Sequence, residues 1–197
     1  MICLSTAAKM RLLLTIPAIL NVRCISASKE FPEVNPMLGP WQDLNMVFPL
    51  TDTWYVTYRN YEDDPVFGAA RCLRTKQDSP ETESGYPIIV NYDGLDEPIT
   101  LLLTTSPSDG YTVNNRIKVV PEGGGEATEY HVIFGELDVC AISRNTYIND
   151  EAMMVFVSKA YIEKNGPEAT CCDFLYTMLA GSSPKYDIYE ERCLTSE

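Results

Sequence analysis

The sequence predicts a mainly β fold: an eight-stranded antiparallel up-and-down barrel, with a short N-terminal helix and a C-terminal helix packed outside it. Two observations support this prediction. Short runs rich in β-branched and aromatic residues recur at the spacing of a sandwich or barrel, and clusters of Gly, Pro, Asp and Ser separate them. A helix at each end of such a meander favours closure into a barrel with room for a small ligand. A β-sandwich is the main structural alternative.

The first stretch of the chain has the residue order of a secretory signal peptide. Basic residues lead into an apolar run over residues 12–22, and small residues follow. The run is too short to span a bilayer. We therefore expect residues 1–27 to be a signal peptide cleaved around Ala27, with Met10 as an alternative start. Residues 28–197 then form a single domain, which is secreted, extracellular and soluble.

Eight strands are expected in the mature chain, each dense in β-branched or aromatic side chains. They cover residues 53–61, 69–75, 86–92, 99–105, 116–120, 128–135, 139–144 and 152–158. The breaks between them carry turn signals, such as Asp93-Gly94 and the glycine-rich run 121–125. The chain contains no repeat and no linker that divides it in two.

Two helices are expected to frame the strands. Residues 40–44 predict a short helix with proline at its first position. A longer helix begins at Gly166-Pro167 and ends at Gly181, which suits a C-terminal cap. One apolar stripe on this helix should pack on the outside of the sheet, and it consists of Phe174, Leu175, Met178 and Leu179.

Secretion makes the cysteines a disulfide framework. Five cysteines remain in the mature chain, and Cys24 makes a sixth only if cleavage falls before it. Cys171 and Cys172 are adjacent, and on a helix their side chains diverge by roughly 100°. They should therefore reach two different partners, because a ring across one peptide bond is strained.

Charge and composition exclude several functions. The chain has 15 Lys and Arg against 28 Asp and Glu, a net charge of −13, which disfavours nucleic acid and anionic membrane surfaces. Its single histidine, His131, excludes a zinc centre built on two or three histidines. There is no CxxC motif and no GxxxxGK phosphate loop. We expect no metal, no cofactor and no enzymatic activity.

An ordered set of residues resembles a known family, the tick salivary lipocalins, also called tick histamine-binding proteins. The resemblance begins at residues 58–72 (YRNYEDDPVFGAARC) and continues with Val132-Ile133 ahead of Cys140. Cys172 then precedes the helix that ends at Gly181, and Cys193 lies near the end of the chain. The similarity covers nearly all of the mature chain, although no single motif is specific by itself.

The resemblance implies a lipocalin barrel with disulfides Cys72–Cys193 and Cys140–Cys172. In some members of the family a third bridge joins an N-terminal cysteine to the first of an adjacent pair, which corresponds to Cys24 and Cys171 here. That bridge requires cleavage before Cys24. If Cys24 is removed instead, Cys171 is left unpaired and can link two chains.

The resemblance also implies a function. The protein is expected to be a monomer that sequesters a small host inflammatory mediator in its barrel and so damps host defence during blood feeding. The mediator is a biogenic amine such as histamine, or a lipid such as an eicosanoid. The alternative is a protein-binding module that inhibits a host immune or complement protein through its outer surface.

Three residues of the predicted pocket follow from the resemblance: Tyr61, Asp64 and Phe67. A buried carboxylate can pair with an ammonium group, and aromatic faces attract cations. In the alternative interpretation Asp64, which precedes Pro65, is a turn residue, and the two aromatic residues close the end of the barrel.

Most other acids of an amine site are missing. Ala141 stands where an Asp is expected, and residues 153–156 contain no acid. His131 falls where an acid of a second pocket is expected, and Glu129 shares its side of the strand. A neutral, hydrogen-bonded His131 is the alternative. We therefore list Glu129 and His131 as ligand candidates and expect a cavity less acidic and more apolar than a histamine pocket.

Overall fold

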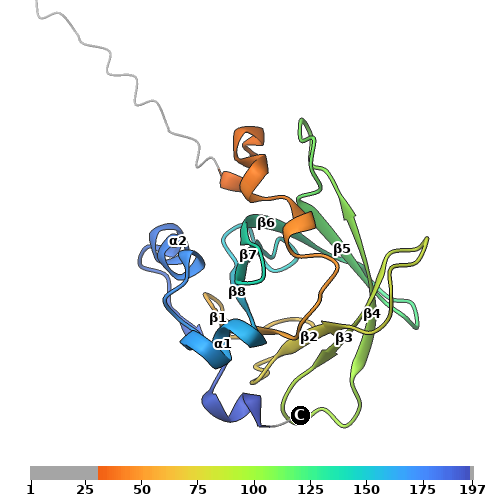
Figure 1. The fold of residues 1–197 in the computed structure, drawn as a ribbon, viewed down its shortest axis with the longest axis vertical. Coiled ribbons are helices and arrows are strands. Elements are labelled where there is room, and N and C mark those ends of the chain that lie inside the picture. Colours follow the sequence, from red (N-terminus) through yellow and green to blue (C-terminus); the bar gives the residue numbers. More distant parts are fainter. Residues whose placement is uncertain (1–30, 196–197) are drawn as a thin grey trace, which may run out of the picture.

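The computed structural model describes residues 31–195, and these form a closed antiparallel barrel (Figure 1). Each strand pairs with the next from β2 to β8, and β1 closes the barrel by pairing with both β8 and β2. The strands are β1 (Trp54–Arg59), β2 (Arg74–Gln77), β3 (Tyr86–Asn91), β4 (Ile99–Ser106), β5 (Arg116–Pro121), β6 (Thr128–Glu136), β7 (Cys140–Arg144) and β8 (Met153–Ser158). The predicted barrel is confirmed.

The edges of the barrel differ from the prediction at β1 and β2. Strand β2 begins at Arg74 and not at residue 69, because Cys72 has a φ of +53° that breaks an extended run. A two-residue strand, β9 (Tyr186–Asp187), pairs with the end of β1 that β2 leaves free. The sequence pattern did not indicate this short strand.

Alternation along the strands creates two cores. In β1, Trp54 and Val56 point into the barrel, whereas Tyr55 and Tyr58 belong to a second layer between the barrel wall and the helices. Every residue of β1 is buried. The strand is therefore apolar on both faces, because the barrel interior covers one and the helices cover the other.

Two helices follow β8, where a single one was predicted. Helix α1 (Lys159–Asn165) continues directly from the strand and ends at Gly166, which has a φ of +87°. Helix α2 (Cys171–Ala180) begins after Thr170, whose hydroxyl accepts a hydrogen bond from the Asp173 backbone N–H at 3.1 Å. It ends at Gly181 as expected.

The predicted apolar stripe of α2 is half wrong. Leu175 and Leu179 pack on the second layer, but Phe174 and Met178 are each 65% exposed. The buried face instead contains Cys172 and Tyr176. The disulfide from Cys172 to Cys140 explains this rotation, because it turns that face of the helix toward β7.

The N-terminal segment forms three 3₁₀ helices instead of one helix over residues 40–44. They are η1 (Pro32–Val34), η2 (Pro36–Trp41) and η3 (Leu44–Met46), and all three pack against β6 (Figure 1). Pro40 lies inside η2, which ends where Gln42 donates from its side-chain amide to the Ile133 carbonyl at 3.1 Å. Residues 44–50, here called the strap, then lead to β1 and place Leu44, Phe48 and Leu50 in the barrel core.

The structure contains the two disulfides that the resemblance implies. Cys72 bonds Cys193, and Cys140 bonds Cys172. Cys171 is exposed and forms no disulfide within residues 31–195. Its proposed partner Cys24, like the predicted signal peptide, lies outside the described residues. Within the described part of the chain, no helix has the length and apolar character needed to cross a membrane.

Candidate functional site

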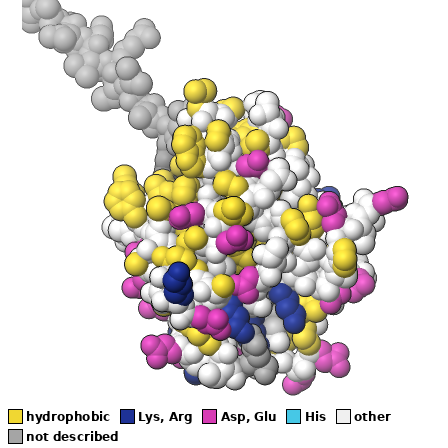
Figure 2. All heavy atoms as spheres, viewed as in Figure 1, with side chains coloured by type: hydrophobic (Ala, Val, Ile, Leu, Met, Phe, Trp, Pro, Cys, Tyr) yellow, Lys and Arg dark blue, Asp and Glu magenta, His cyan; other side chains and the backbone are white. Residues whose placement is uncertain are grey.

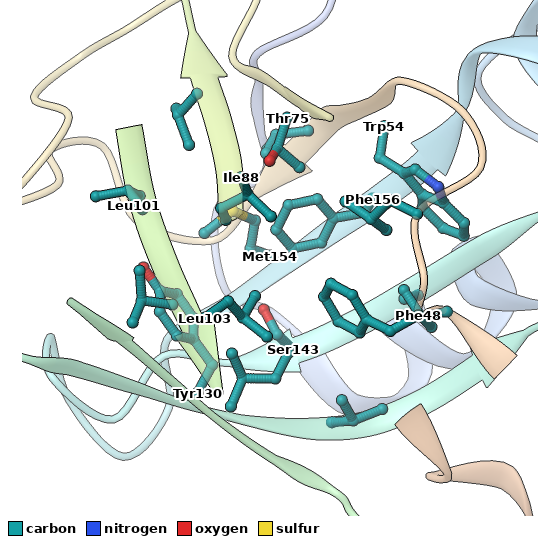
Figure 3. A pocket seen from close by; sticks show the side chains of 18 of the residues that line it. Phe48, Trp54, Thr75, Ile88, Leu101, Leu103, Tyr130, Ser143, Met154 and Phe156 are labelled. Atoms are coloured by element: carbon teal, nitrogen blue, oxygen red, sulfur yellow. The ribbon is translucent and has the colours of Figure 1, made fainter. Parts of the chain in front are cut away.

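An apolar cavity of about 120 Å³ lies inside the barrel (Figure 3). Its wall combines strand residues that point inward with strap residues that cover one side. The side chains include Phe48, Trp54, Phe67, Ile88, Leu103, Val119, Tyr130, Met154 and Phe156. A dry cavity of about 150 Å³ in another protein holds one benzene ring. The cavity therefore matches a single ring in size.

Two aliphatic hydroxyls, those of Thr75 and Ser143, interrupt this apolar wall, and Arg74 and Tyr130 also line it. Figure 3 shows Thr75 and Ser143 on different sides of the cavity, among the side chains of Ile88, Met154 and Leu103. No Asp or Glu is among the lining residues of the described chain. The wall is therefore mainly apolar and carries no acid among the described residues.

Asp64 lies behind the cavity wall at the end where β1 terminates. Its Oδ1 accepts hydrogen bonds from the backbone N–H groups of Val66 at 2.8 Å and Phe67 at 3.2 Å. This is the local turn geometry expected of Asp before Pro. The Asp64 N–H and C=O also pair with the Gly68 backbone, so the loop 64–68 is closed on itself.

The second oxygen of Asp64 joins residues from distant parts of the chain. Tyr147 donates its hydroxyl to Asp64 Oδ2 at 2.7 Å, and Tyr61 donates to the same oxygen at 3.3 Å. The Nη1 atom of Arg59 lies 3.8 Å from it, and both side chains of this ion pair are fully buried. Asp64 therefore has a turn role and a charge-pairing role together.

A chain of hydrogen bonds connects Asp64 to the cavity. The hydroxyl of Tyr61 accepts from the Asn145 side-chain amide at 2.6 Å, and Asn145 Oδ1 accepts from the Ser143 hydroxyl at 2.8 Å. Ser143 lines the cavity. A polar group at Ser143 can thus affect Asp64 through two intervening side chains.

Burial raises the pKa values of two tyrosines in this network, Tyr61 and Tyr147. Desolvation is the main cause that raises the pKa of Tyr61 and of Tyr147 above 10, and the negative charge of Asp64 raises each pKa further. Both phenols are therefore protonated at neutral pH. They act as hydrogen-bond donors to the carboxylate and not as bases.

Arg59 completes the network from the opposite side. Its Nη2 donates to the backbone carbonyls of Glu62 and Gly68 at 2.7 Å each, and its guanidinium lies 4.8 Å from the Tyr61 ring centroid. Its Nε and Nη1 have no hydrogen-bond partner among the described residues, although Nη1 faces Asp64. The arginine holds the loop and neutralises the buried acid.

The other predicted ligand residues lie in different places. Phe67 lines the cavity, and Tyr61 packs in the barrel core next to Asp64. Glu129 and His131 do not line it: they point outward from β6, while Tyr130 between them points inward. The Nε2 atom of His131 lies 3.3 Å from the carboxylate of Glu129. The sequence pattern correctly placed Glu129 and His131 on the same side of β6, but that side faces away from the cavity.

Sequence reasoning missed four members of the network: Arg59, Ser143, Asn145 and Tyr147. Arg59 sits only five residues before Asp64, and an arginine inside an otherwise apolar strand is a signal for a buried charge pair. The other three follow β7 or end it, more than 75 residues away from Asp64 in sequence. Nothing in one sequence indicates that this hairpin reaches the 64–68 loop.

Among the described residues, no group of three or more His, Cys, Asp or Glu side chains could hold a metal ion. The closed barrel, its apolar cavity and the external helix together define a lipocalin-like binding protein.

Comparison with known proteins identifies the family. The family model described as tick histamine binding protein matches residues 32–195, so the chain belongs to this family. The family is one of ligand-binding proteins. A search of curated proteins found no match. The crystal structure of AM182 in complex with serotonin is similar, with a TM-score of 0.54 and 18% identity over 75% of this chain and 88% of that chain. At this identity the likeness supports the shared fold.

Proposed function

We propose that this protein is secreted and sequesters a small host mediator inside its barrel, with biogenic amines as the first ligand class. The observation that carries the proposal is the apolar cavity of about 120 Å³ between the strap and the strands. Pockets of this kind bind the apolar body of a ligand and orient it with a few polar groups. Membership of the histamine-binding family and the serotonin bound to AM182 both favour an amine with one compact ring system.

The size of the cavity separates the two ligand classes. A single ring fits the observed volume, whereas the long chain of an eicosanoid needs several times more space. Binding such a lipid would require the strap to move, because Leu44, Phe48 and Leu50 occupy one side of the cavity. A lipid mediator is therefore the second class, and it predicts a displaced strap in the complex.

An amine needs a partner for its ammonium group, and Asp64 is the candidate. Among the described acids only Glu33 and Asp64 are buried, and Glu33 is engaged by Arg144 at 2.5 Å. The weakest hydrogen bond to Asp64 Oδ2 is the one from Tyr61, at 3.3 Å. An ammonium that approaches past Phe67 could replace this hydroxyl and donate to Asp64 directly.

Calorimetric titration of the secreted protein tests the proposal. The titrants are histamine, serotonin, a leukotriene, a thromboxane analogue and cholesterol. Ala141→Leu, which places a larger side chain on the cavity wall, should abolish binding, whereas Ala160→Leu on the exposed side of α1 should not. Near-ultraviolet circular dichroism checks that both variants fold. If no titrant binds, or if Ala141→Leu binds as well as wild type, the barrel cavity is not the ligand site.

The outer surface supports a second candidate, inhibition of a host immune or complement protein. Figure 2 shows hydrophobic side chains gathered on the face that carries α2 and the N-terminal 3₁₀ helices. The exposed large hydrophobic side chains of these elements include Met37 and Trp41 of η2 and Phe174 and Met178 of α2. Exposed apolar groups of this kind mark interaction surfaces when they are contiguous. This candidate predicts that Trp41→Ser reduces inhibition in complement assays while calorimetric ligand binding stays unchanged.

A further inference from the structure

Thr75 carries a hydroxyl for which the protein provides no partner. The residue lies in β2, directly opposite Trp54 of β1 and Val90 of β3, and it lines the cavity. Its Oγ1 is buried and makes no hydrogen bond to any described residue. Buried hydroxyls in folded proteins are nearly always bonded, so an exception in a binding cavity calls for an explanation.

The hydroxyl of Ser143, unlike that of Thr75, has a hydrogen-bond partner in the protein. Ser143 donates its proton to Asn145 at 2.8 Å, so it can only accept a further hydrogen bond. Thr75 retains both its donor and its acceptor capacity. Of the two hydroxyls, Thr75 is therefore the one that can bind either an acceptor or a donor on a ligand.

A bound water molecule is a poor explanation for this site. A buried water needs two to four polar partners. The residues that face Thr75 across the two neighbouring strands are Trp54 and Val90, and the cavity wall around it is mainly hydrocarbon. One threonine hydroxyl on an apolar wall does not meet the requirement, whereas a ligand that fills the cavity can bring its own polar atom.

We propose that Thr75 hydrogen-bonds a polar group on the ring of the ligand. The barrel then selects compact rings that carry a hydroxyl or N–H group over hydrocarbon rings of the same size. The inference rests on the proposed function, because it requires the ligand to occupy the barrel cavity. It adds the kind of ring that the barrel prefers and the residue that recognises it.

The test compares phenol with toluene, which have the same number of heavy atoms and differ by a hydroxyl in place of a methyl group. Dissociation constants for both are measured by NMR titration of the secreted wild-type protein and of two variants. Thr75→Val removes the hydroxyl with little change of shape. Thr104→Val is the matched control, because Thr104 is exposed on β4 outside the cavity.

Thr75→Val should weaken the binding of phenol relative to that of toluene by about tenfold. This is the contribution expected from one hydrogen bond to a buried group. Thr104→Val should leave the ratio of the two constants unchanged. Without ligand, Thr75→Val should melt no lower than wild type, because it removes an unsatisfied polar atom. If the hydroxyl of Thr75 stabilised the fold instead, Thr75→Val would lower the melting temperature.

The outcomes separate this inference from the proposed function. If both probes bind and their ratio is the same in Thr75→Val as in wild type, the role of Thr75 is overturned and the cavity function stands. An equal loss of both probes in Thr75→Val, or a lower melting temperature, also overturns it, because packing is then the cause. If neither probe binds wild type, the inference about Thr75 fails, and the calorimetric titration decides the proposed function separately.

Discussion

The buried pair of Arg59 and Asp64 allows a quantitative prediction for Asp64→Asn. Both side chains are fully buried, and 3.8 Å separates Arg59 Nη1 from Asp64 Oδ2. Asparagine keeps an oxygen for the N–H groups of Val66 and Phe67, so the turn can form. It removes the negative charge, however, and leaves the guanidinium buried without a counter-charge.

Breaking one side of a buried ion pair costs about 3–5 kcal/mol. The hydrogen bond from Tyr147, at 2.7 Å, also changes from a charge-assisted bond to a neutral one. We therefore expect Asp64→Asn to lower the free energy of unfolding by about 4 kcal/mol. For a domain of this size that corresponds to a melting temperature lower by roughly 8–16 °C.

Urea unfolding at pH 7 measures the change, with the fluorescence of the buried Trp54 as the signal. The matched control is Asp63→Asn, because Asp63 is the exposed neighbour of Asp64. A surface substitution of this kind should alter stability by no more than about 0.5 kcal/mol. If the two variants are equally stable, the ion pair does not stabilise the barrel end and the argument from its burial is refuted.

Two further predictions concern ionisation. The pKa of Tyr61 and that of Tyr147 are raised in the folded protein, mainly by burial, so the unfolded chain loses protons first as pH rises above 10. The free energy of unfolding should therefore be unchanged below pH 10 and fall above it by about 1.4 kcal/mol per pH unit for each such tyrosine. Urea unfolding midpoints between pH 9 and 11 measure this fall. If Tyr147→Phe loses stability with pH as steeply as wild type, the prediction is contradicted. The charge of Glu136, followed by desolvation, raises the pKa of the exposed Cys171 thiol, so Glu136→Gln should lower that pKa. In a chain that begins at Ser28, and so lacks Cys24, iodoacetamide should then alkylate Cys171 faster at pH 8 in Glu136→Gln than in wild type; equal rates by mass spectrometry would show that the carboxylate does not influence the thiol.

The strands of the barrel were predictable because their signal is local. Alternating or continuous apolar runs and turn residues place most strand boundaries within one or two residues of those observed. The failures arise where a distant contact overrides the local pattern. Cys172 bonds Cys140, and this link decides which face of α2 is buried. Phe174 and Met178 satisfy the helical period equally well but face solvent.

The candidate site was predictable only in part, for the same reason. The residue type and position of Asp64 indicated either a partner for an amine or a turn residue. The turn hydrogen bonds are present, and the ion pair with Arg59 was not predicted. The rest of its network could not be assigned, because Tyr147, which bonds Asp64, and Asn145, which bonds Tyr61, come from the β7–β8 connection. His131 and Glu129 shared a phase as expected, but phase alone does not tell which side of a barrel strand faces inward.

The net negative charge of the chain does not determine which class of ligand binds in the barrel. The net charge is −13, yet the two buried acids of the described residues each have an arginine beside them: Arg144 for Glu33 and Arg59 for Asp64. Without a ligand each of these buried carboxylates is thus already paired with a positive charge. An ammonium group gains affinity there only if it takes over hydrogen bonds that Asp64 now receives from Tyr61 and Tyr147. The affinity difference between an amine and its uncharged analogue thus measures that exchange of partners, while the apolar wall and the hydroxyl of Thr75 determine which ring is held.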